Sequence, residues 1–181
     1  MDTTTISVYT NNIINDGWGV AVAAKQYDDQ LATGTIYAAE NAVAAMLDRG
    51  GLVDFHGSLL ALDGCRVRRY TPQQVPLLQG MIGGLWRVHG TGGPPPSLRA
   101  SARAGGGRAW YNHNTREIVL PTHSWAWNDL VILHELSHAC TGVGGDQRSS
   151  HGHTWRKNYC SLVSEVVGPE AGLLLMDALA I

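Results

Sequence analysis

The chain has 181 residues, of which 44% are hydrophobic and 15% charged, and its formal net charge is −2. This length and composition predict one globular domain over residues 1–181 with a full core, and they exclude a disordered chain. The weak negative charge gives no argument for a nucleic acid or an anionic membrane as the partner.

The three cysteines, Cys65, Cys140 and Cys160, lie far apart and form no Cys-x-x-Cys motif. We therefore expect no disulfide framework and a reducing compartment. The N-terminus lacks the basic and apolar regions of a signal peptide, and the longest apolar stretch, Leu173-Leu174-Leu175-Met176, is too short to span a bilayer. A cytoplasmic protein is the simplest expectation.

The first part of the chain predicts a helix followed by a hairpin. Residues 1–27 give only a weak and mixed signal. Residues 28–49 repeat apolar side chains at helical steps, and Gly50-Gly51 directly after them predicts the end of that helix. Two short runs, 58–62 and 65–70, then flank an Asp-Gly pair, which predicts a β-hairpin with a tight turn.

A second helix and a loop follow. Thr71-Pro72 is a typical helix start, and the apolar periodicity continues to about His89. Residues 90–108 are rich in glycine and proline, so we expect a mobile loop there rather than a packed element. Residues 109–113 and 117–121 predict a second hairpin.

The C-terminal part predicts three helices. The first is expected to begin near Ser124, as its N-cap, and to end at Gly142. The second is expected over roughly 153–166. Pro169-Glu170 begins a final short helix, with Leu173, Leu174 and Ala178 expected inside.

The first of these helices carries His134-Glu135-x-x-His138 within an apolar run that contains no glycine or proline. On a helix, His134 and His138 lie one turn apart on the same face, roughly 6 Å from each other, so they can share one metal ion. Glu135 lies about 100° around the helix from His134, where it can act as a general base without binding the metal. Two ligands and a base on one helix are typical of zinc hydrolases.

A catalytic zinc ion usually has three protein ligands and a water molecule, so the motif needs one more ligand. Four residues are candidates from their positions in the sequence: His151, His153, Glu165 and His123. The metzincin pattern is excluded, because it requires glycine and histidine at the positions of Thr141 and Gly144.

His134-Glu135-x-x-His138 followed by His151-Gly152-x-x-Trp155 resembles the SprT-like zinc metallopeptidases. The resemblance covers about residues 125–165. It implies that His151 is the third zinc ligand and that Trp155 is a packing residue one turn further along.

The chain also resembles a group of small predicted metallohydrolases from actinobacteria and their phages. That similarity extends to Tyr37-Ala38-Ala39-Glu40 and to Phe55-His56-Gly57-Ser58. The sequence has no cysteine pairs for a zinc ribbon and no basic segment, so the DNA-associated substrates of some SprT-like proteins are not carried over.

The resemblance implies an α+β zincin-like fold, in which a small twisted sheet packs against the metal helix. We expect a zinc-dependent metallopeptidase that cleaves a peptide or amide bond of a protein or peptide substrate, with Glu135 moving the proton of the attacking water. A sheet edge near 117–121 could pair with an extended substrate, and Tyr159 is either an oxyanion donor or a packing residue. The alternative is a metal-stabilised binding or regulatory module with little turnover, which a fourth ligand such as His153 would favour.

Overall fold

The computed structural model describes residues 19–102, 107–142 and 151–181, with side chains from residue 34 onward. The element order mixes helices with two small sheets, so the fold class is α+β, as predicted. Residues 1–18 of the weak-signal segment 1–27, residues 103–106 of the predicted loop over 90–108, and residues 143–150 lie outside the described residues.

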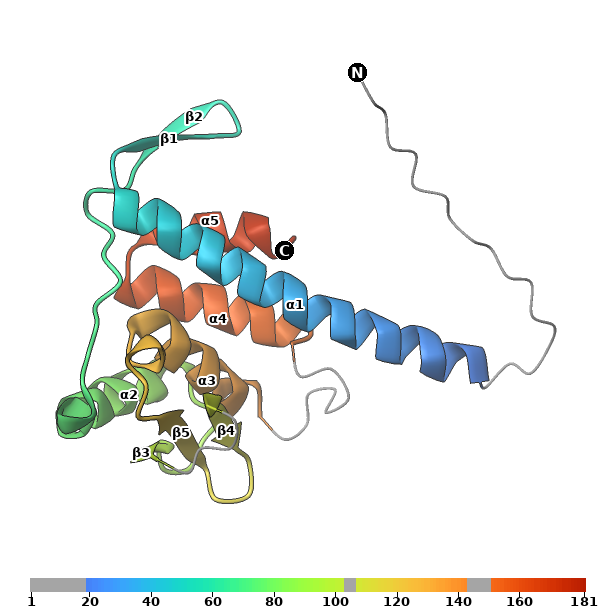
Figure 1. Ribbon diagram of the computed structural model, residues 1–181, viewed down its shortest axis with the longest axis vertical. Coiled ribbons are helices and arrows are strands. Elements are labelled where there is room, and N and C mark those ends of the chain that lie inside the picture. Colours follow the sequence, from blue (N-terminus) through green and yellow to red (C-terminus); the bar gives the residue numbers. More distant parts are fainter. Residues whose placement is uncertain (1–18, 103–106, 143–150) are drawn as a thin grey trace.

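Five α-helices make up most of the structure, and Figure 1 shows α1 running alongside α4 and α5. Their bounds are α1 Gly19–Arg49, α2 Val75–His89, α3 Asp129–Thr141, α4 His153–Val166 and α5 Pro169–Ala178. Within the described part of the chain, none of the helices is long and apolar enough to cross a membrane.

The predicted helix ends agree with the structure where a glycine or a proline lies at the end of the helix. α1 stops at Arg49 before two glycines with positive φ, although it begins nine residues before the predicted start. The single-turn helix η1, Pro72–Gln74, precedes α2, and the Gln74 side chain accepts a hydrogen bond from the backbone N–H of Thr71 at 2.9 Å. α4 matches the predicted 153–166.

Helices α4 and α5 cross closely. A Cβ atom at Gly172 of α5 would lie only 2.6 Å from the Cβ atom of Ser164 on α4, so a larger residue would push the two helices apart. Leu174 faces the core from α5, but Leu173 and Ala178 are exposed, contrary to the prediction. The buried side of α5 runs through Ala171 and Leu175 instead.

The first hairpin is shifted from its predicted position. β1 Leu52–Phe55 pairs antiparallel with β2 Ser58–Ala61, and the turn is His56-Gly57, both with positive φ. Positive φ at both central residues is the requirement of a type I′ turn, so the chain reverses at His56-Gly57 and not at the predicted Asp63-Gly64. Asp63 instead closes the base of the hairpin by accepting the N–H of Gly51 at 2.8 Å.

Residues 65–70 therefore do not form a hairpin strand. They run along the start of α3, where Arg69 makes an isolated antiparallel bridge to Asn128 and the backbone N–H of Arg68 donates to Asp129 at 2.7 Å. The alternation in this run reflects contact with α3 on one side and solvent on the other.

The second sheet has three strands in the order β3-β5-β4 (Figure 1). β4 Trp110–Asn112 and β5 Glu117–Pro121 form the predicted antiparallel hairpin. β3 Ser97–Ser101 pairs parallel with β5, so part of the predicted mobile loop is a strand whose Leu98 is buried.

The presence of β3 changes the prediction of a substrate-binding edge. β5 lies between β3 and β4, so it is the central strand and not the expected edge strand; β3 pairs along all of 117–121, and β4 covers Glu117–Val119 on the other side. α3 contacts β4 and β5, and it packs along α4 on its other side. The metal motif is thus held between the sheet and the C-terminal helices.

Candidate metal centre

α3 carries the histidine motif, and a side-chain cap stabilises the start of this helix. Asn128, not Ser124, is its N-cap: the Asn128 side chain accepts the backbone N–H of Val131 at 3.1 Å. Ser124 begins the separate short helix η3 Ser124–Ala126. α3 ends before Gly142, whose φ is 72°, as the sequence predicted.

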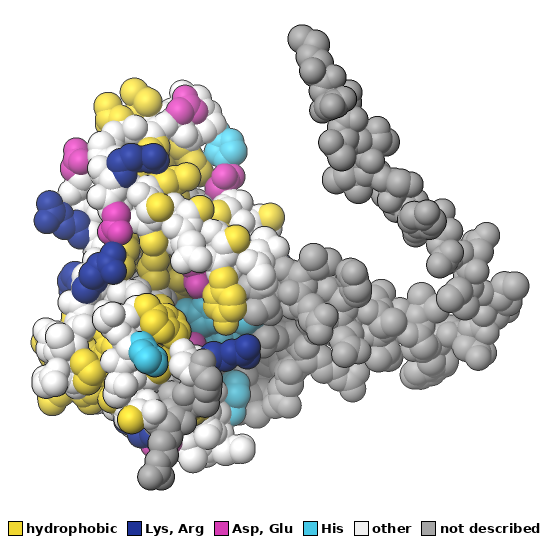
Figure 2. All heavy atoms as spheres, viewed as in Figure 1, with side chains coloured by type: hydrophobic (Ala, Val, Ile, Leu, Met, Phe, Trp, Pro, Cys, Tyr) yellow, Lys and Arg dark blue, Asp and Glu magenta, His cyan; other side chains and the backbone are white. Residues whose placement is uncertain are grey.

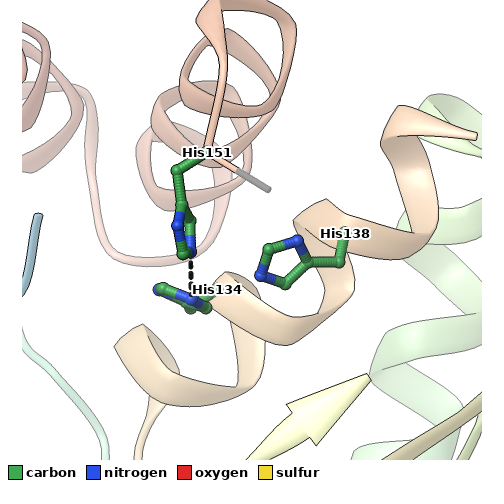
Figure 3. A group of neighbouring side chains, drawn as sticks. All are labelled: His134, His138 and His151. Carbon is green, nitrogen blue, oxygen red and sulfur yellow. Dashed lines mark hydrogen bonds between the residues drawn. The ribbon is translucent and has the colours of Figure 1, made fainter. Parts of the chain in front are cut away.

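His134, His138 and His151 converge on one point (Figure 3). Their candidate ligand atoms all lie within 4.8 Å of one another, and the Nε2 atoms of His134 and His151 are 3.1 Å apart. His134 and His138 come from α3, and His151 comes from the residues just before α4. The three imidazoles could therefore hold a metal ion.

The other three candidate ligands do not join this group. His153 is exposed at the start of α4, and His123 is exposed beside Gly107. The Glu165 carboxylate is 2.7 Å from Nε2 of His89 and forms an ion pair there when His89 is protonated. Among the described residues, no fourth histidine, cysteine or carboxylate completes the cluster.

Glu40 of α1 is a site residue that the sequence did not predict as a partner of the motif. Its Oε1 lies 2.6 Å from Nδ1 of His134, and both side chains are largely buried. A carboxylate on Nδ1 holds the proton there and leaves the Nε2 lone pair directed at the cluster. Because 94 residues separate the two positions, no local pattern could have paired them.

The environment keeps His138 and His151 uncharged. Burial, followed by the charge of His134, lowers the pKa of His138 to about 2 and that of His151 to about 3. Burial also disfavours the charged form of His134, but the hydrogen bond and the charge of Glu40 outweigh it and raise its pKa. Neutral imidazoles offer the lone pairs that a metal ion requires.

Glu135 is buried beside the cluster with little to stabilise its charge. Burial is the main cause that raises its pKa to about 7, although the charge of His134 and a backbone hydrogen bond from Tyr111 oppose the shift. A carboxyl group with a pKa near neutrality can accept and release a proton efficiently at neutral pH. The predicted role of general base is compatible with this position.

Aromatic rings enclose the histidines. Trp155 is buried, as expected for a packing residue, and its ring centroid lies 4.4 Å from that of His151 and 4.7 Å from that of His134. Tyr159 is also fully buried, with its hydroxyl 3.4 Å from the carbonyl oxygen of Leu130, so it is a packing residue rather than an oxyanion donor. Tyr37 stacks on His134 from the solvent side at 5.8 Å.

The cluster is open to solvent on one side. A hollow of about 230 Å³ is lined by the three histidines, Glu135 and residues of β4. Figure 2 shows histidine and carboxylate side chains in the middle of one face, with hydrophobic side chains beside them. A small molecule or a peptide can therefore reach the candidate metal position.

No protein-family model, no curated protein and no solved structure matches this chain.

Proposed function

We propose that the protein is a zinc-dependent hydrolase, specifically a zincin-like metallopeptidase related to the SprT-like group. The observation that carries the proposal is the convergence of His134, His138 and His151 beside the buried Glu135. Three protein ligands with one position left for substrate or water are typical of catalytic zinc, whereas structural zinc usually has four.

The donor set fits zinc. Zinc–imidazole bonds of about 2.0–2.1 Å in a tetrahedral site place ligand nitrogens roughly 3.3 Å apart. The His134–His151 distance of 3.1 Å is close to this value, and small side-chain rotations would bring His138 to it. Glu40 would orient His134, as carboxylates commonly do for zinc-binding histidines.

When bound, zinc would supply a Lewis acid that polarises a water molecule and the scissile carbonyl group. Glu135 would accept a proton from the attacking water as the carbon–oxygen bond forms. The same carboxyl group would deliver that proton to the amine as the carbon–nitrogen bond breaks. Trp155 and Tyr159 would exclude water from behind the histidines and fix their orientation.

The alternative of a metal-stabilised binding module is less well supported. It would gain from a fourth protein ligand, but His153 is exposed and Glu165 lies against His89.

We place the protein in the cytoplasm because its three buried cysteines are all free thiols, as is usual in a reducing compartment.

The test compares zinc content and turnover in matched variants. Purified wild-type protein should hold one zinc ion per chain by elemental analysis and should cleave members of an internally quenched peptide library. Glu135→Gln should keep the zinc but lose about 10²–10⁴-fold in turnover, because glutamine cannot accept a proton. His138→Ala should lose the zinc itself.

Two outcomes would contradict the proposal. Wild-type protein that takes up no zinc when zinc is added would exclude the metal site. Glu135→Gln that cleaves the same peptides as fast as wild type would exclude the hydrolytic mechanism. His123→Ala, at an exposed histidine outside the cluster, is the matched control for the loss of an imidazole.

A further inference from the structure

A larger groove begins at the candidate metal centre and leads away from it. Its volume is about 670 Å³, and it shares Tyr37, Ala109, His134 and Glu135 with the smaller hollow that contains the three histidines. The carboxylate of the proposed base thus lies where the two hollows meet. Whatever occupies the groove would be continuous with a group bound at the metal.

One wall of the groove is a single stripe of α1. It is formed by Tyr37, Glu40, Asn41, Ala44 and Asp48, whose spacing of three and four residues places them on one helical face. At 1.5 Å per residue the stripe is about 16 Å long, which matches about five residues of an extended peptide at 3.3 Å each. This wall of the groove is therefore long enough to lie beside about five residues of an extended chain.

The floor is apolar, and the rim carries an exposed aromatic ring. Leu130 and Val131 of α3 form the floor together with Val67. Trp125 stands at the rim with 50% of its surface exposed. An aromatic side chain that is half exposed over an apolar floor is a favourable contact for a bulky apolar group.

The backbone that carries Trp125 is held firmly. The Asn128 side chain donates to the Trp125 carbonyl oxygen at 2.7 Å, and the neighbouring Trp127 is buried with its indole N–H on the Pro121 carbonyl oxygen at 2.7 Å. A rigid platform loses little conformational entropy when it binds a ligand.

Charges of both signs line the groove, so it is not a basic track for a nucleic acid. Asp48 and Arg69 form an ion pair of 3.1 Å at one end, and Arg108 lies on the lining nearer the metal centre. Backbone amides and mixed side chains of a polypeptide suit such a lining better than a polyanion does.

We infer that this groove binds about five residues of an extended polypeptide on one side of the scissile bond, with a bulky apolar side chain on Trp125. The inference rests on the proposed function, because the groove leads from the proposed metal and base. It makes the substrate an unfolded or flexible protein segment rather than a dipeptide or a small amide.

The test uses hydroxamates, which bind zinc directly. Acetohydroxamate reports the metal alone, and two series of peptides of one to six residues carry the hydroxamate at the C-terminal or the N-terminal end. Titration calorimetry on zinc-loaded protein measures the affinity of each. In one series or both, affinity should rise with length and level off at about five residues. Phenylalanine in place of alanine at one position should add about tenfold.

Two variants show whether this gain comes from the groove. Ala44→Arg should fill the groove and remove the gain with length, and Trp125→Ala should remove the preference for phenylalanine. Both should leave acetohydroxamate binding unchanged. Leu77→Ala, an exposed apolar residue on α2, is the matched control and should change nothing.

The possible failures are distinguishable. If acetohydroxamate does not bind zinc-loaded protein, the proposed metal site fails and the groove loses its role with it. If acetohydroxamate binds but affinity does not rise with length, or if the rise survives in Ala44→Arg, the groove inference alone is overturned. A loss of the length effect in Ala44→Arg supports it.

Discussion

Two buried carboxylates on α3, Asp129 and Glu135, differ in the hydrogen-bond donors that surround them. Asp129 is 0% exposed and accepts hydrogen bonds from the backbone and guanidinium of Arg68 and from the hydroxyl of Tyr70, at 2.7 to 3.2 Å. Glu135 is 6% exposed, and burial raises its pKa to about 7 despite a backbone hydrogen bond from Tyr111. The same helix thus holds one well-satisfied charge and one poorly satisfied charge.

This difference separates a structural role from a chemical one. A buried carboxylate with several donors fixes the elements that supply those donors, so Asp129 ties residues 68–70 to the start of α3. A buried carboxylate with few donors is held close to its neutral form, which costs stability but prepares the group for proton transfer. The two residues should therefore respond oppositely to conversion into an amide.

The largest expected effect on stability is a gain at Glu135. In metal-free protein, Glu135→Gln should raise the free energy of unfolding at pH 8 by on the order of 3 kcal/mol, because the raised folded pKa disfavours the charged native state. The gain should shrink as the pH falls through 7 and vanish below about 4.5. Urea unfolding at pH 8 and pH 4 in the presence of a chelator measures it. A loss of stability at pH 8 would contradict this account of Glu135.

Asp129→Asn should act in the opposite direction. We expect a loss of roughly 2–3 kcal/mol, because the amide replaces an acceptor by a donor that faces Arg68 and Tyr70. Asp48→Asn, whose partner Arg69 is exposed, is the control and should cost below about 1 kcal/mol. Equal losses in the two variants would show that burial does not strengthen the Asp129 cluster.

Glu40→Gln tests a third carboxylate, the one that contacts the candidate metal ligand His134. The variant should weaken zinc binding by about 10–100-fold, because a neutral amide orients and polarises His134 less well than a carboxylate does. Competition with a zinc-binding dye measures the affinity. Glu165→Gln, at the carboxylate beside His89, is the matched control and should bind zinc like wild type.

The smallest expected effect is that of Tyr70→Phe. The variant removes one hydrogen-bond donor from Asp129 while Arg68 remains, so we expect a loss of about 1 kcal/mol. Thermal unfolding followed by circular dichroism is sufficient to detect it. A loss as large as that in Asp129→Asn would mean that the hydroxyl, rather than the guanidinium, secures the carboxylate.

The sequence predicted best where the information is local. The helical period placed His134 and His138 on one face, and glycines marked the ends of α1 and α3. His151 followed from the family resemblance, and the structure brings it to the other two histidines.

Long-range contacts were not predictable in this way. Glu40 meets His134 only because α1 lies close to α3 in the fold, and β3 forms only because β5 offers a parallel partner to a stretch whose composition resembles a loop. The first hairpin was misplaced because Asp63-Gly64 is the stronger turn signal, whereas His56-Gly57 adopts the required positive φ values.

The position of Glu40 on the groove-facing stripe of α1 has a thermodynamic consequence. One rigid helix touches both the histidine that would hold the metal and the path along which a polypeptide would lie. If metal binding fixes α1 against α3, the groove is formed before a polypeptide arrives, and a bound polypeptide in turn raises the affinity for the metal. Linkage requires that the two affinities rise by the same factor. The affinity for the metal and the affinity for the polypeptide would then be coupled through α1.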